Sequence, residues 1–174
     1  MIVKTNTKNI VLCALFTALI TLSTMVIQIP MPVSGYVNLG DVFILVCVFV
    51  LSPLYSVLAA GFGSMFADLL SGYVIFAPAT LIIKATMAMM AHLVFKAVYK
   101  SFKNKFVATL ISGIVAELIM VAGYFLYSCL IMSEGLVAAT SIPGNLIQGA
   151  IGVFGGLTII SILDRTKIFK NKDK

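Results

Sequence analysis

The sequence predicts an all-α integral membrane protein, a six-transmembrane-helix bundle that forms one membrane domain over residues 1–174. Hydrophobic residues make up 61% of the chain and charged residues only 10%, whereas a soluble globular domain carries about 25% charged residues. The mean hydropathy is +1.13. Apolar runs near the ~20 residues that one membrane-spanning helix requires recur between short polar breaks. A soluble core does not account for this composition, so we expect the chain to cross a membrane repeatedly.

Six apolar ranges are expected to be helices, at about 10–29, 41–52, 53–71, 79–99, 106–132 and 142–163. Pro30 and Pro32 end the first range, and Pro53 suits the first turn of the third. The second range is short for a ~30 Å hydrocarbon core at ~1.5 Å per residue. We therefore expect it to tilt, to draw in part of the preceding loop, or to cross incompletely.

The distribution of charge predicts the topology. Apart from Lys84, the basic residues form three clusters: Lys4 and Lys8; Lys96, Lys100, Lys103 and Lys105; and the stretch from Arg165 to Lys174. Six crossings place these clusters on one side and leave the opposite loops without Lys or Arg. The positive-inside rule then assigns both termini to the cytoplasm. The net charge of +6 is therefore explained by membrane topology, and we expect no nucleic-acid partner. Binding of anionic lipid by the tail "DRTKIFKNKDK" is a secondary hypothesis.

The signals of an enzyme or a metalloprotein are missing from the sequence. It contains no G-x-x-x-x-G-K-[ST] loop for ATP, no H-E-x-x-H motif and no Cys/His cluster. The single histidine, His92, is assigned to packing. The isolated cysteines are interpreted as small buried hydrophobes: Cys13, Cys47 and Cys129. We therefore expect no catalytic site, no metal and no cofactor.

Four ionisable residues lie inside or at the edge of apolar ranges: Asp41, Asp68, Lys84 and Glu117. Each costs ~2.5–3.5 kcal/mol if it is central and unpaired. The topology places Asp41 at the outer start of the second range and Glu117 near the middle of the fifth. Two structural interpretations of these residues stay open, and each is independent of the other. In the first, Asp68 and Lys84 neutralise each other as an ion pair. In the second, Glu117 is protonated and bonded to a neighbouring helix.

Helical spacing gathers polar and aromatic residues on one stripe of each of the last three ranges. Converging stripes form an outward-facing pocket with one cation, amides, tyrosines and a carboxyl, which suits a small ligand. Tyrosines near the outer boundary have a second interpretation as interface anchors. The stripes are Thr80, Lys84, Met87 and Ala91; Gly113, Glu117, Met120, Tyr124 and Tyr127; and Asn145, Gln148, Gly149, Gly152 and Gly156.

Small residues recur at helix-packing intervals in the first, third and sixth ranges. In the third and sixth, packing inside the bundle is the favoured role. In "ALFTA" of the first range, Ala14 and Ala18 share one face, and contact with a different protein is an alternative. Binding chemistry is present without an energy source, which favours a subunit of a larger transporter.

The chain resembles the substrate-binding S components of energy-coupling factor (ECF) vitamin transporters over nearly its whole length. The likeness rests on "ALFTA", "GYVNLGDVFILVCVFVLSPLYSVLAAGFGSMFADLLSGY", "PATLIIKATMA" and "IPGNLIQG". These segments look like the branch that includes riboflavin, pyridoxine and hydroxymethylpyrimidine S components. The resemblance implies a multi-pass protein of the bacterial cell membrane, with no catalysis of its own.

The resemblance also implies a mechanism and a set of site residues. The subunit captures a vitamin at its outer face with high affinity, under the first loop as a lid. It then docks through Ala14 and Ala18 on a transmembrane coupling protein that carries two ATPase subunits, and ATP hydrolysis drives release inward. The implied lid and rim are Tyr36, Asn38 and Asp41, and the implied pocket residues are Lys84, Glu117, Tyr124, Asn145 and Gln148.

The predicted pocket chemistry favours a small heteroaromatic alcohol, pyridoxine or hydroxymethylpyrimidine, and riboflavin is the alternative substrate. Folate is disfavoured because no run of basic residues is available to hold several carboxylates. Two other classes stay open. A self-sufficient membrane carrier would transport without partners, and a structural or assembly subunit would bind no small molecule.

Overall fold

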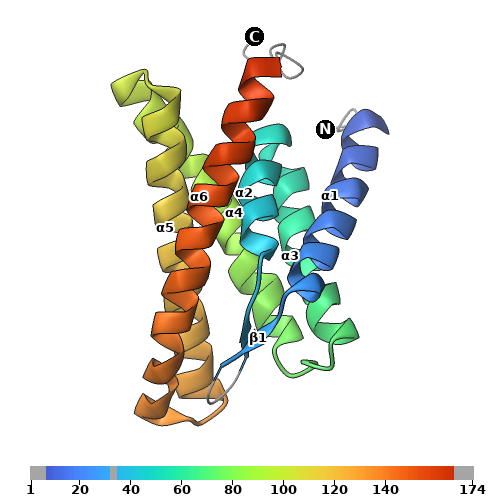
Figure 1. Cartoon of the computed structure of the whole chain (residues 1–174), viewed down its shortest axis with the longest axis vertical. Helices are drawn as coiled ribbons and strands as arrows, with labels where there is room; N and C mark the ends of the chain where they lie inside the picture. Colours follow the sequence, from blue (N-terminus) through green and yellow to red (C-terminus); the bar gives the residue numbers. More distant parts are fainter. Residues whose placement is uncertain (1–6, 32–34, 167–174) are drawn as a thin grey trace, which may run out of the picture.

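The computed structural model describes residues 7–31 and 35–166, which form a helical bundle with one small hairpin (Figure 1). Lys4 and most of the basic tail, residues 167–174, lie outside these residues. The predicted all-α membrane bundle is confirmed. The helices are α1 (Thr7–Val26), α2 (Gly40–Val50), α3 (Pro53–Leu70), α4 (Ala77–Phe102), α5 (Lys105–Leu126) and α6 (Ile142–Thr166). The hairpin pairs β1 (Ile29–Pro30) with β2 (Tyr36–Val37) in antiparallel register.

Five helical segments of the described chain are long and apolar enough to cross a membrane. They are α1, α3, α4, the segment Lys105–Ile131 that starts with α5, and the segment Gly135–Arg165 that contains most of α6. The exception is α2, which has only 11 residues and spans about 16 Å at ~1.5 Å per residue. The hairpin continues the path of α2 toward the opposite end of the bundle (Figure 1). This crossing therefore combines a short helix with extended chain.

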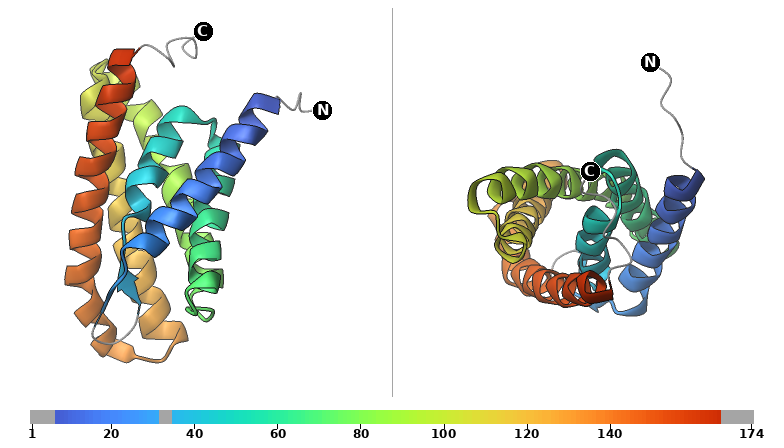
Figure 2. Two further views of the ribbon diagram at one scale, coloured as in Figure 1. Left: turned by 45° about the vertical axis from the view of Figure 1, so that its right-hand side comes forward. Right: turned by 90° about the horizontal axis from the view of Figure 1, so that it is seen from above.

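The short helix α2 occupies the centre of the bundle. It packs on α6, α1, α3 and α4, and Asp41, Ile44 and Cys47 on it are fully buried. Seen from above, the long helices surround it (Figure 2). A central helix packs closely only against small neighbours, and α6 supplies them: a Cβ atom at Gly156 would lie 3.0 Å from Leu45 Cβ. Small residues of α6 thus serve packing inside the bundle.

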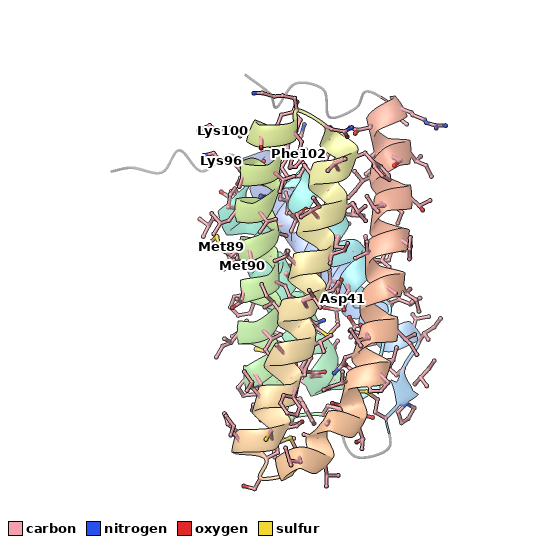
Figure 3. All side chains as sticks on the ribbon, turned by 90° about the vertical axis from the view of Figure 1, so that its left-hand side faces the viewer. Asp41, Met89, Met90, Lys96, Lys100 and Phe102 are labelled. Carbon is pink, nitrogen blue, oxygen red and sulfur yellow. The ribbon has the colours of Figure 1, made fainter. Side chains whose placement is uncertain are left out.

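The bundle has two chemically different ends. Helix α1 begins, and helix α6 ends, at the same end of the bundle (Figure 1). Lys96 and Lys100 lie at this end too (Figure 3). We call this the basic end and define it by Lys8, Lys96, Lys100, Lys103, Lys105 and Arg165. The loop end, opposite, carries the hairpin, the turn between α3 and α4, and the connection between α5 and α6. That the basic end faces the cytoplasm stays a prediction.

Local sequence explains where several helices begin and end. Pro53 stands in the first turn of α3, where its missing N–H is no loss. Lys103 ends α4 in a left-handed conformation with φ 53°, and the Asn104 side chain accepts the first N–H bond of α5 from Val107 at 3.1 Å. The apolar range that follows does not stay α-helical. After Leu126 it continues as a π-helix, Tyr127–Ile131, and then a 3-10 helix, Gly135–Ser141.

Candidate ligand-binding site

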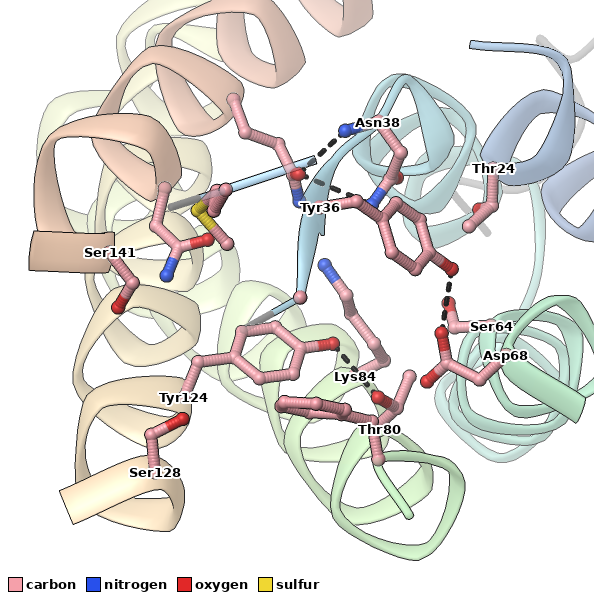
Figure 4. A pocket seen from close by; sticks show the side chains of 15 residues that line it. Thr24, Tyr36, Asn38, Ser64, Asp68, Thr80, Lys84, Tyr124, Ser128 and Ser141 are labelled. Carbon is pink, nitrogen blue, oxygen red and sulfur yellow. Dashed lines mark hydrogen bonds between the residues drawn. The ribbon is translucent and has the colours of Figure 1, made fainter. Parts of the chain in front are cut away.

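A pocket of about 500 Å³, including its open mouth, lies toward the loop end between the hairpin and helices α1, α3, α4, α5 and α6 (Figure 4). Most of its lining residues have polar side chains, and aromatic rings lie on two sides. The lining residues are Thr24, Met31, Gly35, Tyr36, Asn38, Ser64, Asp68, Phe76, Thr80, Lys84, Tyr124, Ser128, Ser141, Asn145 and Gln148.

A buried polar network forms the floor of this pocket. Lys84 of α4 makes an ion pair with Asp41 Oδ1 at the start of α2. The other oxygen of Asp41 accepts a hydrogen bond from Gln148 Nε2 of α6 at 2.6 Å. Gln148 Oε1 in turn accepts from the Asn38 backbone N–H at 2.8 Å, and Asn38 Oδ1 accepts from the Gly40 N–H at 2.9 Å. The network therefore fixes the start of α2 to α4, α6 and the hairpin.

The ion pair corrects two expectations about acidic residues. Lys84 pairs with Asp41, so the proposed Asp68–Lys84 pair is wrong. Asp41 was placed on the outer rim of the site, but it is fully buried below the pocket, about halfway along the bundle (Figure 3). The physical reason is the short α2, which begins deep inside the bundle and brings its first acidic side chain to the level of Lys84.

Asp68 instead holds the hairpin against α3. Its Oδ1 accepts a hydrogen bond of 2.6 Å from the Tyr36 hydroxyl, and the Tyr36 ring packs on Tyr73 with centroids 4.5 Å apart. The phenol O–H is the donor in this contact, and the hairpin is attached to α3 at this point.

Several buried polar atoms at the pocket wall have no hydrogen-bond partner among the described residues. They are Thr24 Oγ1, Ser64 Oγ, Asp68 Oδ2 and Asn145 Nδ2. The first three face the pocket from α1 and α3, and Asn145 lies on α6. A buried polar atom without a partner costs about 1–3 kcal/mol. A ligand with hydrogen-bonding groups at these places would remove that cost, so the arrangement is suited to binding.

Comparison with known proteins identifies the family. A family model described as "ECF-type riboflavin transporter, S component" matches residues 4–165. The chain belongs to this family. It is therefore the substrate-binding subunit of an ECF vitamin transporter, a multi-pass membrane protein, as the sequence segments predicted. The family works with an ECF module and a small vitamin ligand.

Two further similarities concern the sequence and the fold. The S component is 32% identical over 144 residues to an "Uncharacterized protein in gap 3'region" of Pyrococcus woesei, covering 81% of this chain and 93% of that protein. It also shares the fold of a solved structure, the S component of a bacterial ECF transporter. That match has a TM-score of 0.70 at 17% identity and covers 92% of this chain and 98% of the other.

Most of the predicted ligand residues of this S component meet at one pocket. Asp41 supports the pocket from below as the partner of Lys84. Glu117 also lies outside the lining, packed against Gly149 and Gly152 of α6, and neither of its carboxyl oxygens has a partner among the described residues. The predicted residues that line the pocket are Tyr36, Asn38, Lys84, Tyr124, Asn145 and Gln148.

Sequence reasoning did not assign several polar lining residues to the pocket. Ser64 and Asp68 lie four residues apart on α3, so their helical spacing was an available signal. Ser128 follows Tyr124 by four residues and belongs to the π-helical turn, a type of turn that is frequent at functional sites. Thr24 stands near the end of α1 beside Ser23 and one turn after Thr21, so its sequence neighbours do not single it out, and only the packed structure brings it to the pocket.

Ala14 and Ala18 lie far from this pocket, exposed on the outer face of α1. A shallow apolar hollow surrounds them, and Phe62 and Phe66 of α3 form its other wall. Because the side chains of the two alanines are small, the backbone of α1 is accessible along this face. That access is the condition for close helix–helix contact in a membrane.

The buried ion pair predicts a large difference in stability between two lysine substitutions. Lys84→Met leaves Asp41 buried without a counter-charge and should lower the free energy of unfolding by about 3–5 kcal/mol. Lys105→Gln removes one partner of the half-exposed pair with Asp164 and should cost less than about 1 kcal/mol. Thermal unfolding of both variants in detergent measures the difference, and equal midpoints would contradict the assignment of Lys84 to a buried pair.

Proposed function

We propose that this S component binds riboflavin in the pocket at the loop end and delivers it through the ECF module. The observation that carries the proposal is the arrangement of unpartnered polar atoms and aromatic rings in a pocket whose only lysine is already paired. The name of the matching family, a riboflavin S component family, points to the same vitamin.

Charge favours an uncharged vitamin over a phosphorylated or carboxylated one. Lys84 is the only Lys or Arg among the lining residues, and Asp41 balances its charge. The remaining charged group at the wall is Asp68, which repels anions. An anionic ligand would lose its hydration without gaining an ionic partner, which is costly in a buried site. Folate and flavin mononucleotide are therefore disfavoured.

The two kinds of wall match the two parts of riboflavin. Its flat ring system suits the space between the aromatic rings of Tyr36, Phe76 and Tyr124, which line the pocket. Its hydroxyl-bearing chain suits the unpartnered oxygens of Thr24, Ser64 and Asp68. The free N–H of Asn145 suits a carbonyl oxygen at the ring edge. Together these contacts would satisfy the polar atoms that have no partner among the described residues.

A smaller ring such as pyridoxine or hydroxymethylpyrimidine is the second candidate. The observation in its favour is the small number of unpartnered polar atoms at the wall, four among the described residues, which a small alcohol has enough polar groups to satisfy. Both candidates share the requirement for an uncharged heteroaromatic alcohol. They differ in how much of the wall they cover.

Titration of the purified S component with riboflavin tests the proposal, because flavin fluorescence falls when the ring packs on tyrosine. We expect nanomolar affinity for riboflavin, and an affinity at least about 100-fold lower for flavin mononucleotide, a difference of ~2.7 kcal/mol. Asn145→Leu should weaken riboflavin binding about tenfold or more. Thr158→Val, on the exposed face of α6, is the matched control and should have no effect.

Competition separates the two candidate vitamins. Riboflavin should resist displacement by equimolar pyridoxine or hydroxymethylpyrimidine. Displacement by either would transfer the assignment to the smaller ring, and tight binding of flavin mononucleotide would contradict the charge argument for both.

The exposed face at Ala14 and Ala18 is the proposed contact with the transmembrane coupling protein, whose two ATPase subunits supply the energy. Ala18→Trp places a large ring where the partner backbone would approach, and should abolish vitamin uptake while leaving vitamin binding unchanged. Ala150→Trp, at an exposed position of α6, should leave uptake intact. Uptake and binding assays on the two variants check this, and loss of binding in Ala18→Trp would show that this face serves folding.

A further inference from the structure

A second cavity opens at the basic end of the bundle, away from the ligand pocket. It lies among α1, α2, α4, α5 and α6 and encloses about 1,340 Å³ including its mouth. Leu45, one turn after Asp41 on α2, belongs to its wall. The cavity therefore reaches toward the level of the Asp41–Lys84 pair from the side opposite the vitamin pocket, and the two spaces share no lining residue.

The lining of this cavity is polar at its mouth and mixed further in, where the polar side chains of His92, Thr109 and Ser112 are already hydrogen-bonded within the protein. At the mouth lie Asn9 in the first turn of α1 and Lys105, the first residue of α5. Deeper, Val48, Val153 and Leu157 form an apolar wall. Such a wall holds water poorly, since waters in protein cavities need several polar partners. An amphiphile with its polar group at the mouth and its chain inward fits this order.

We propose that the cavity binds the acyl chain of an anionic phospholipid, whose phosphate is held at the Lys105 ammonium. Lys105 stands 4.4 Å from the centroid of the Phe49 ring, which lines the cavity. Its bond to Asp164 at 2.7 Å leaves further N–H donors of the ammonium group for a phosphate oxygen. The lipid would enter from the leaflet that borders the basic end.

The charge of this end selects the anionic headgroup. Lys96, Lys100 and Lys103 are exposed here, and Asp164 is the one acidic residue that the described part of the chain contributes to this end. Basic clusters beside a membrane attract anionic lipids. A zwitterionic headgroup gains less from this surplus of positive charge, so the proposal predicts a preference for phosphatidylglycerol over phosphatidylcholine inside the cavity.

The chain has no tryptophan, so one introduced tryptophan can report on the cavity. Phe49→Trp keeps an aromatic face for Lys105, and bromine atoms on an acyl chain quench tryptophan on contact. The variant is reconstituted in phosphatidylcholine bilayers with equal fractions of either brominated phosphatidylglycerol or brominated phosphatidylcholine. Quenching by the brominated phosphatidylglycerol should be at least about twofold stronger.

Three controls decide the source of the effect. Phe154→Trp, on the lipid-exposed face of α6, should show no headgroup preference, and an equal preference there would reduce the effect to general attraction around the protein. Lys105→Gln in the Phe49→Trp background should remove the preference, whereas Lys100→Gln, an equal loss of charge outside the cavity, should retain it.

Loss of the preference in inorganic phosphate, at constant ionic strength, would overturn the lipid assignment in favour of a soluble anion. Equal quenching of Phe49→Trp by both brominated lipids would overturn the proposal outright.

Discussion

The Asp41–Lys84 ion pair is the interaction on which the arrangement of this S component depends. A lysine in the interior of a membrane bundle is costly unless an opposite charge meets it there, and α2 brings Asp41 to that position. Gln148 and Asn38 complete the contact and link α6 and the hairpin to the same point. The pair thereby attaches the start of α2 to α4 beneath the pocket.

The pair also determines what kind of molecule the pocket suits. By neutralising its only lysine, it leaves a wall whose free groups are hydroxyls, an amide and one carboxylate oxygen. These groups match hydroxyls and carbonyls better than phosphates. The same network, with Leu45 below it, divides the interior into a polar space at the loop end and an amphipathic cavity at the basic end. Each end therefore has chemistry suited to a different ligand.

Periodicity of sequence was sufficient to predict the bundle and much of the pocket. Lys84, Tyr124, Asn145 and Gln148 stand on helical stripes, and a stripe on a long helix must face one direction. The partner of Lys84 was out of reach, because it depends on the depth at which α2 begins. That depth follows from the length of α2 and the extended hairpin before it, which hydropathy alone does not specify. The unpartnered atoms of Thr24 and Ser64 depend likewise on how α1 and α3 pack, and no pattern within one helix records that contact.

The affinity of the Asp41→Asn variant for flavin mononucleotide relative to riboflavin tests the central claim most directly. An amide at position 41 keeps the shape of the side chain but removes the negative charge, which frees the positive charge of Lys84 beside the pocket. If Asp41 is what makes the pocket reject anions, the ratio of the two dissociation constants should fall at least about tenfold, ~1.4 kcal/mol, relative to the natural protein. An unchanged ratio, with riboflavin binding retained, would contradict the account.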